Sequence, residues 1–315
     1  MIRSALQSAR QEEPIKEMQL MSLIKNLFHI ALQVDDFDES IAFYRDKLGF
    51  DEMFSLKLGD FRDILDMHDS DKNNDANWLT YIRVAPEEYL EVFNGVINPP
   101  DFELLKTDHK RAPVFHSFSI GCEDPEKAAK ILEERGVLAV NGIITDPSGC
   151  KIRIVERKRD RKTEKERLFN CLAGVSIYVN DLQKMSAYLQ RMGMKKTGET
   201  ENSICLVMGE DDQFLELIQS LEPVAVTDDG ILGHLALQIY SISDVVWEWG
   251  NAGVRCCMQP TEKDHPLEVK KGTIGNFASD GCEIVWAVSE AGNRFEIMRQ
   301  PGDNIQQKFE REHPF

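Results

Sequence analysis

One glutamate is the strongest candidate for chemistry, because it lies inside an apolar segment. Glu91 stands between Leu90 and Val92 in the run EEYLEVFN. On a β-strand its side chain faces opposite to both neighbours. A carboxylate buried there without a partner costs several kcal/mol or is forced neutral. A cavity that holds a cation is therefore the economical explanation for this residue.

Three histidines, His29, His116 and His234, lie near the start of strand-like segments. Imidazole and carboxylate groups bind divalent transition metals, so these residues could contribute to a metal site. Alternatively, each is a core histidine paired to a backbone carbonyl, which is the commoner arrangement for a lone histidine. The sequence contains neither a G-x-S-x-G elbow nor a G-x-x-x-x-G-K-[ST] loop, which argues against serine hydrolases and P-loop NTPases.

The elements that would position these residues repeat along the chain. Residues 28–50 combine an apolar run, an Asp pair, apolar residues at helical spacing and a closing glycine. The same order returns at 173–194, and a second type of unit begins at Phe115 and returns at Gly233. The pattern predicts a strand, a helix and two or three further strands, four times over.

The repeats also set the expected boundaries. The nearly all-charged run RKRDRKTEKER predicts an exposed linker between two halves. The expected order is an N-terminal extension (1–25), a first half (26–158, with modules 26–95 and 113–158), a linker (159–168), a second half (169–290, with modules 169–220 and 231–288) and a C-terminal tail (291–315).

Composition narrows the classes of partner. The 315 residues carry 37 Lys+Arg against 54 Asp+Glu, a formal net charge of −17. Such a surface repels phosphate backbones and anionic lipid, so we expect a small-molecule substrate and neither nucleic-acid nor membrane partners. The seven cysteines include no C-x-x-C pair and follow no signal-like segment, which favours reduced thiols in the cytoplasm. A homodimer stays open.

With these repeats, the chain resembles the vicinal oxygen chelate (VOC) superfamily, which includes glyoxalase I, bleomycin-resistance proteins and extradiol ring-cleaving dioxygenases. The resemblance covers about residues 26–290, carried by paired modules with His on a first strand and Glu on a last strand. It implies an α+β fold of four tandem βαβββ modules, paired into two halves whose curled mixed sheets surround a cavity.

The resemblance also implies a ligand set in the first half. His29, Glu91 and His116 match three ligand positions, and Arg153 stands where a fourth, a carboxylate, is expected. Two histidines and one carboxylate leave open positions on a divalent ion, so we expect one Zn, Ni, Mn, Co or Fe ion. Arg153 could instead bind a substrate anion, because its guanidinium fork suits a carboxylate or phosphate.

The second half matches the pattern less well. Glu216 and His234 match two ligand positions, but Gly174 and Val285 occupy the other two. Two ligands rarely hold a catalytic metal, so a scaffold or a degenerate second site is expected there. In the first half, Tyr81 and Arg83 lie on a strand and are further candidates for substrate binding.

The implied activity is that of a glyoxalase-like lyase or isomerase acting on a small oxygenated substrate through a metal-stabilised enediolate. Glu91 would be the catalytic base, since a carboxylate that leaves the metal can accept a proton. One alternative is an extradiol-type dioxygenase with non-haem iron, although Gly174 and Val285 depart from its ligand pattern. The other is a metal-free small-molecule binding or resistance protein.

Overall fold

The computed structural model describes residues 23–61, 75–97, 112–113, 115–157, 166–210, 212–225, 232–258, 283–291, 293–300, 302 and 304–315. Most of the N-terminal extension and of the charged linker expected from the sequence lies outside these residues. No helix in the described part of the chain is both long enough and apolar enough to cross a membrane.

Four modules with the order strand, helix and further strands follow one another, which confirms the expected α+β class. Module 1 contains β1 (Ile24–Val34), α1 (Phe37–Ala42), the π-helical segment η1 (Phe43–Lys47), β2 (Asp51–Lys57), the 3₁₀ segment η2 (Leu58–Phe61), β3 (Asn77–Ala85) and β4 (Glu88–Asn94). Module 2 contains β6 (Phe115–Cys122), α3 (Pro125–Glu134), β7 (Ile143–Thr145) and β8 (Lys151–Glu156). The short strand β5 (Ala112–Pro113) precedes it.

The second half of the chain repeats this order. Module 3 contains β9 (Cys171–Val179), α4 (Leu182–Arg191), β10 (Lys195–Glu199), β11 (Ser203–Met208) and β12 (Gln213–Gln219). Module 4 contains β14 (Leu232–Ile239), α5 (Ile242–Asn251), β15 (Cys256–Cys257), β16 (Glu283–Val288) and β17 (Arg294–Arg299). The short β13 (Val224–Ala225) pairs with β5, and the helix α6 (Ile305–Glu312) ends the chain.

The helices begin and end by the same local signals in every module. An Asp or Ser side chain caps the N-terminus of each by accepting a backbone N–H: Asp36, Asp124, Asp181 and Ser241. A glycine with positive φ follows each helical segment: Gly49, Gly136, Gly193 and Gly253. The repeated Asp and Gly positions in the sequence therefore mark the same turns in the fold.

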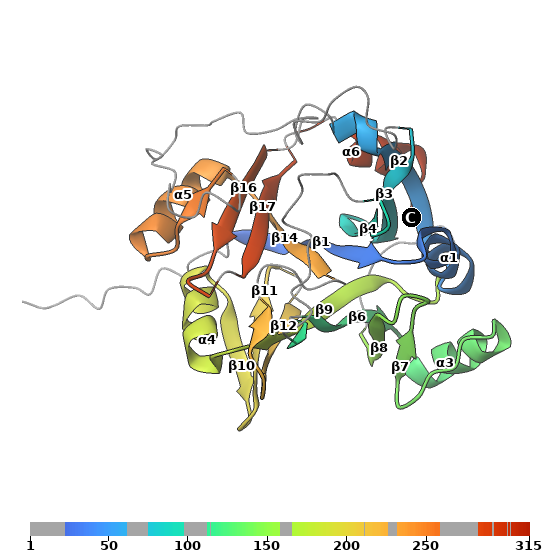
Figure 1. Ribbon diagram of the computed structural model, residues 1–315, viewed down its shortest axis with the longest axis horizontal. Helices are drawn as coiled ribbons and strands as arrows, with labels where there is room; N and C mark the ends of the chain where they lie inside the picture. The colour runs from blue at the N-terminus through green and yellow to red at the C-terminus, as the bar shows by residue number, and fades with distance from the viewer. Residues whose placement is uncertain are drawn as a thin grey trace, which may run out of the picture.

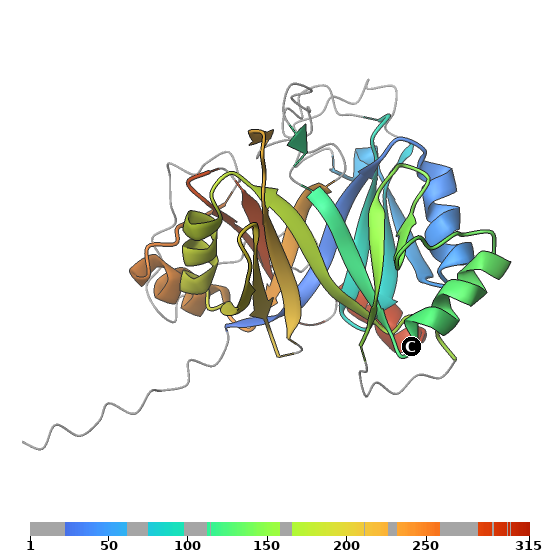
Figure 2. The same cartoon turned by 90° about the horizontal axis from the view of Figure 1, so that it is seen from below.

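The strands form two mixed sheets, one of eight strands in the order β15-β16-β17-β14-β1-β4-β3-β2 and one of seven in the order β10-β11-β12-β9-β6-β8-β7. The first strand of each module runs parallel to its last strand. Figure 2 shows α1 and α3 together at one end, α4 and α5 at the other, and the sheets between them.

Each sheet joins modules from different halves of the sequence, which corrects one expectation. We expected the ligand-bearing strands of module 1 to meet those of module 2. Instead β1 pairs antiparallel with β14, so module 1 shares its sheet with module 4 (Figure 1). Module 2 shares the other sheet with module 3 through β6 and β9.

Buried polar side chains connect the two sheets, and Gln213 is one of them. Gln213 accepts a hydrogen bond from the backbone N–H of Leu27 at 2.6 Å and donates one to the carbonyl of Leu172 at 2.7 Å. It thereby satisfies backbone groups of β1 and β9 that the ladders leave unpaired.

The segment expected to be a C-terminal tail (291–315) is structured where it is described. It supplies β17, which pairs with β14 and β16, and then α6. Figure 1 shows α6 beside β2 and β3, where it packs against module 1. The closing strand of module 4 is therefore β17, beyond the predicted boundary at residue 288.

Candidate metal centre

Four side chains converge on one point of the eight-stranded sheet. His29 and Glu91 come from module 1, and His234 and Glu296 come from module 4. The two histidine Nε2 atoms lie 3.0 Å apart. Glu296 Oε2 lies 3.0 Å from His29 Nε2 and 3.1 Å from His234 Nε2. Glu91 Oε2 lies 3.3 and 3.5 Å from the same two nitrogens.

The strand register explains why these residues meet. In module 1, Glu91 lies opposite Ala31 on the parallel neighbour strand, two residues beyond His29. In module 4, Glu296 lies opposite Ala236, two residues beyond His234. Residues two apart share a face of the sheet, so each module presents one His and one Glu on the same face. The antiparallel pairing of β1 with β14 then brings the two pairs together.

The spacing of these atoms suits a divalent metal ion. Two ligand atoms bound at 2.0–2.2 Å are roughly 3.0 Å apart at a right angle and roughly 3.4 Å apart at a tetrahedral angle. The five distances, from 3.0 to 3.5 Å, match those edges. Two carboxylates and two neutral imidazoles also balance the charge of a dication. The four side chains therefore fit the metal that the resemblance implies.

The pKa shifts of His234 and Glu296 indicate that a positive charge stabilises this site. Burial lowers the pKa of His234, but hydrogen bonds with Glu296 and Glu91 outweigh it and raise the pKa to about 9. Burial raises the pKa of Glu296, but His234 and His29 hold it well below its usual range. The buried carboxylates are thus balanced by a proton on His234, which a divalent ion would displace.

The two glutamates of the centre are held differently. Glu296 Oε2 lies within hydrogen-bond distance of both histidine Nε2 atoms, at 3.0 and 3.1 Å. Glu91 lies farther from both nitrogens, and its Oε1 accepts a hydrogen bond from the Tyr81 hydroxyl. Among the described residues, the group spaced most tightly for a metal is His29, His234 and Glu296. Glu91 borders that group.

The third histidine expected from the sequence is not part of this centre. His116 lies on β6 in the other sheet, where a bulge separates the pairings Phe115–Ile177 and Ser117–Ser176. The register places Ser117, not His116, at the position equivalent to His234, because Arg153 lies opposite Ser119. The structure thus replaces His116 with His234, which the sequence assigned to a degenerate site.

Glu296 is the functional candidate that the sequence analysis missed. The sequence predicts that module 4 ends at residue 288 and assigns Val285 to the position of the last ligand. A signal was present: the run RFEIMR (294–299) carries a glutamate between apolar residues, as LEV does around Glu91. Its place beyond a predicted boundary hid it.

The second sheet has an equivalent set of positions with different side chains. Arg153 Nη1 lies 3.2 Å from Glu216 Oε2, and the Ser176 hydroxyl donates to the same oxygen at 2.6 Å. A side chain at Gly174 would place its Cβ 2.3 Å from the carbonyl oxygen of Phe214, so no ligand fits there. Arg153 and Glu216 form an ion pair where the first sheet has two carboxylates.

The two remaining substrate-binding candidates are in different surroundings. Tyr81 is buried against Glu91 in the centre. Arg83 is also buried, but its donors go to Asp51 at 2.6 Å and to Glu310 of α6 at 2.7 Å. The Phe309 and Phe315 rings lie 5.1 and 5.4 Å from its guanidinium carbon. Arg83 therefore anchors the C-terminal helix, and these contacts occupy the group that would bind a substrate.

Comparison with known proteins agrees with this fold. Residues 26–160 match the family model of the Glyoxalase/Bleomycin resistance protein/Dioxygenase superfamily. Glyoxalase I from Zea mays is similar in structure, with 16% identity, a TM-score of 0.56, and coverage of 92% of this chain and 97% of that one. A Bacillus subtilis "putative dioxygenase" has 15% identity and a TM-score of 0.58, with 91% of this chain and 90% of that one covered. No curated protein sequence matches significantly.

The family-model match over residues 26–160 and the similar folds of these two structures agree with the resemblance to the vicinal oxygen chelate superfamily expected from the repeats. At 15–16% identity the structural likeness establishes the fold alone. The activity therefore has to be argued from the centre itself.

Proposed function

We propose that the protein is a metal-dependent lyase or isomerase of the glyoxalase type, which moves a proton on a small oxygenated substrate. The observation that carries the proposal is the unequal pair of glutamates. Glu296 is held by both histidines, whereas Glu91 is farther from them and hydrogen-bonded to Tyr81. One carboxylate is thus suited to hold the ion and the other to accept a proton.

His29, His234 and Glu296 would hold the ion, with Glu91 as a fourth ligand or as the base. A bound divalent ion supplies Lewis acidity toward adjacent substrate oxygens, which acidifies the neighbouring C–H bond. Glu91 Oε2 takes that proton and returns it to the adjacent carbon, while the Tyr81 hydroxyl holds Oε1 in place. Because His234 is the most exposed of the four groups, at 16% of its side chain, we expect substrate to enter beside it.

A second candidate function rests on a specific observation. His29, His234 and Glu296 alone are two histidines and one carboxylate, the ligand set of many non-haem iron oxygenases. An extradiol-type ring cleavage therefore remains the alternative. The additional carboxylate Glu91, which such a triad does not need, favours proton transfer.

The experiment uses full-length protein stripped of metal and reconstituted separately with Zn, Ni, Co, Mn and, without oxygen, Fe(II). Each form is assayed for isomerisation of the hemithioacetal of methylglyoxal and glutathione and for oxygen uptake with catechol. We expect isomerisation with at least one non-iron metal and no catechol-dependent oxygen uptake. Oxygen uptake with iron and no isomerisation would establish the dioxygenase. Failure to bind any metal would leave the third alternative, a metal-free binding protein.

Two further expectations belong with this proposal. A cytoplasmic location is favoured by the cysteines, because the six among the described residues are free thiols. A small-molecule substrate is favoured by the neighbouring glyoxalase fold. Size-exclusion chromatography with light scattering would show whether the protein forms the homodimer that the sequence leaves open.

A further inference from the structure

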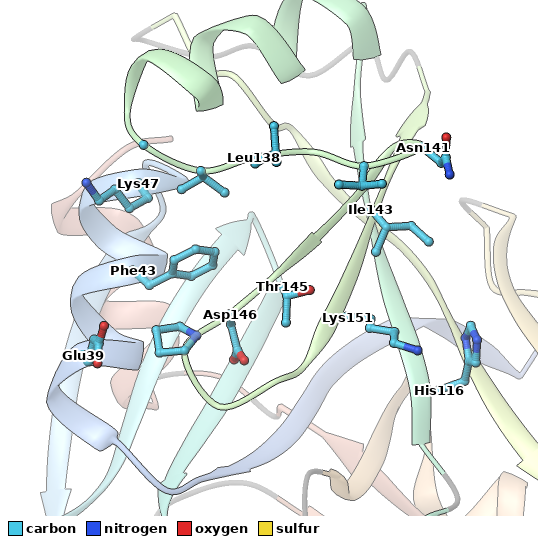
Figure 3. Close-up of a pocket in the computed structure, with 14 residues that line it drawn as sticks. Glu39, Phe43, Lys47, His116, Leu138, Asn141, Ile143, Thr145, Asp146 and Lys151 are labelled. Carbon is cyan, nitrogen blue, oxygen red and sulfur yellow. The ribbon is translucent and has the colours of Figure 1, made fainter.

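A cavity of about 640 Å³ lies away from the metal centre, between the helical segment of module 1 and the β7–β8 edge of module 2. Figure 3 shows Phe43 and Leu138 on one side of it, and Lys151 and His116 at the other. None of His29, Glu91, His234 and Glu296 lines this cavity. Its residues are also distinct from the ion pair of the second sheet, although they adjoin it.

Apolar side chains that line the cavity are exposed to solvent. Phe43 is buried, but Leu138 is 67% exposed and Val140 is 58% exposed. Ile143 adds a further apolar side chain to the lining. Exposed apolar side chains that gather around one hollow are typical of a ligand site rather than of ordinary surface.

The opposite end of the cavity is positively charged. The Lys151 amino group points toward His116 in Figure 3, and this amino group, unlike the Lys151 backbone, has no hydrogen-bond or ion-pair partner among the residues that the structure describes. Burial, together with the charges of Lys151 and Arg153, lowers the pKa of His116. The positive charges of Lys151 and Arg153 therefore both act on the His116 side chain. Arg153 is only partly neutralised, because one of its nitrogens pairs with Glu216.

The charge of this end specifies the ligand. Near His116, Lys151 and Arg153 contribute two positive charges and Glu216 one negative charge, whereas the two carboxylates that line the cavity, Glu39 and Asp146, lie with Lys47 on its Phe43 side (Figure 3). An anion with one charge is balanced there, whereas a phosphate dianion is not. The apolar side of the cavity suits an aliphatic or aromatic body.

We propose that this cavity binds a small organic carboxylate whose carboxyl group lies between Lys151 and His116 and whose apolar body lies on Phe43, Leu138 and Ile143. The site is separate from the metal centre and does not depend on its chemistry. It gives the acidic protein a second ligand site, built where modules 1 and 2 meet.

The test measures binding of three carboxylates of increasing length, namely benzoate, phenylacetate and 3-phenylpropionate, to the full chain by calorimetry and ligand-observed NMR. The matched neutral probe is 3-phenylpropionamide. We expect saturable binding of at least one carboxylate, and an affinity at least about tenfold lower for the amide, because the charge-assisted contact is lost.

Two lysines of the same cavity provide a matched pair of variants. Lys151→Gln removes the unpaired ammonium and should weaken carboxylate binding about tenfold. Lys47→Gln is the control, because the Lys47 amino group donates to the Arg135 carbonyl at 2.7 Å and is already engaged. We expect Lys47→Gln to bind as the unmodified protein does. Circular dichroism checks that both variants fold.

The proposal is overturned if none of the three carboxylates binds at millimolar concentration, or if the amide binds equally well. It is also overturned if Lys151→Gln binds normally while Glu91→Gln does not, since that result would place the ligand at the metal centre. Binding that survives in Glu91→Gln and weakens in Lys151→Gln supports it, whatever metal or activity the first sheet proves to have.

Discussion

The two sheets of this protein share one arrangement of strands and differ at the four positions where their modules meet. In every module, one first-strand position could hold a ligand. A long polar side chain on the last strand lies opposite the first-strand residue two positions further on. The first sheet has His29, Glu91, His234 and Glu296 at these positions, and the second has Gly174, Glu216, Ser117 and Arg153.

The comparison shows how the same backbone can create or remove a need for metal. Two carboxylates and two imidazoles in a buried site are stable only with a cation. In the second sheet the cation is a side chain of the protein itself, because the Arg153 guanidinium forms an ion pair with Glu216. The candidate metal centre is therefore defined by four side chains, and the fold alone would not predict it.

The largest effect that would break this comparison concerns the histidines. His234→Ala removes an Nε2 that lies 3.0 Å from His29 Nε2 and 3.1 Å from Glu296 Oε2. We expect metal affinity to fall by about 100-fold or more, since few protein ligands then remain. Competition titration with a chelating dye measures it. His116→Ala, in the other sheet, should keep its metal, and an equal loss there would move the site to the second sheet.

The next effect separates the two equivalent glutamates. Glu91→Gln keeps the shape of the side chain and removes its basic oxygen, so turnover should fall by about 100-fold with much of the metal retained. Glu216→Gln is the same change at the equivalent position of the second sheet, and it should leave turnover unchanged. Steady-state kinetics on metal-loaded protein compare them. Normal turnover in Glu91→Gln would remove the proposed base.

A third prediction tests why the second sheet has no histidine at the position of His29. Gly174→Ala would bring a Cβ to 2.3 Å from the Phe214 carbonyl oxygen, and we expect a loss of about 2 kcal/mol in stability. Gly198→Ala is the control, because the nearest atom to its Cβ is 3.8 Å away. Urea unfolding of both variants measures the difference. Equal midpoints would show that the close approach does not restrict this position.

The smallest expected effect concerns Tyr81, whose hydroxyl is hydrogen-bonded to Glu91. Tyr81→Phe removes the hydroxyl that donates to Glu91 Oε1 but leaves the ring packed. We expect turnover to fall roughly fivefold, as for loss of one hydrogen bond of about 1 kcal/mol, with metal content unchanged. A fall as large as that of Glu91→Gln would instead make the hydroxyl part of the proton transfer.

The sequence predicts what depends on local periodicity. Strand alternation singles out Glu91, and the repeat predicts four modules with their capping Asp and closing Gly residues. The turn that precedes β8 places Arg153 opposite Ser119, at the position where a carboxylate was expected. These inferences need only a few neighbouring residues, and the fold class follows from their repetition.

The remainder depends on contacts between distant segments. The bulge before Ser117 moves His116 out of register, and no feature of the sequence FHSF marks that bulge. The choice of module 4 as the partner of module 1 is made by the antiparallel pairing of β1 with β14, about 200 residues apart along the chain. Without that pairing, His234 and Glu296 could not be assigned to one site.

The measurement that tests the central claim most directly is the anomalous difference map of crystals grown with cobalt. The structure predicts one strong peak per chain, enclosed by His29, Glu91, His234 and Glu296, and no peak beside Arg153 and Glu216. A peak near His116, or no peak at the four converging side chains in protein that binds cobalt in solution, would contradict the assignment of the metal to the first sheet.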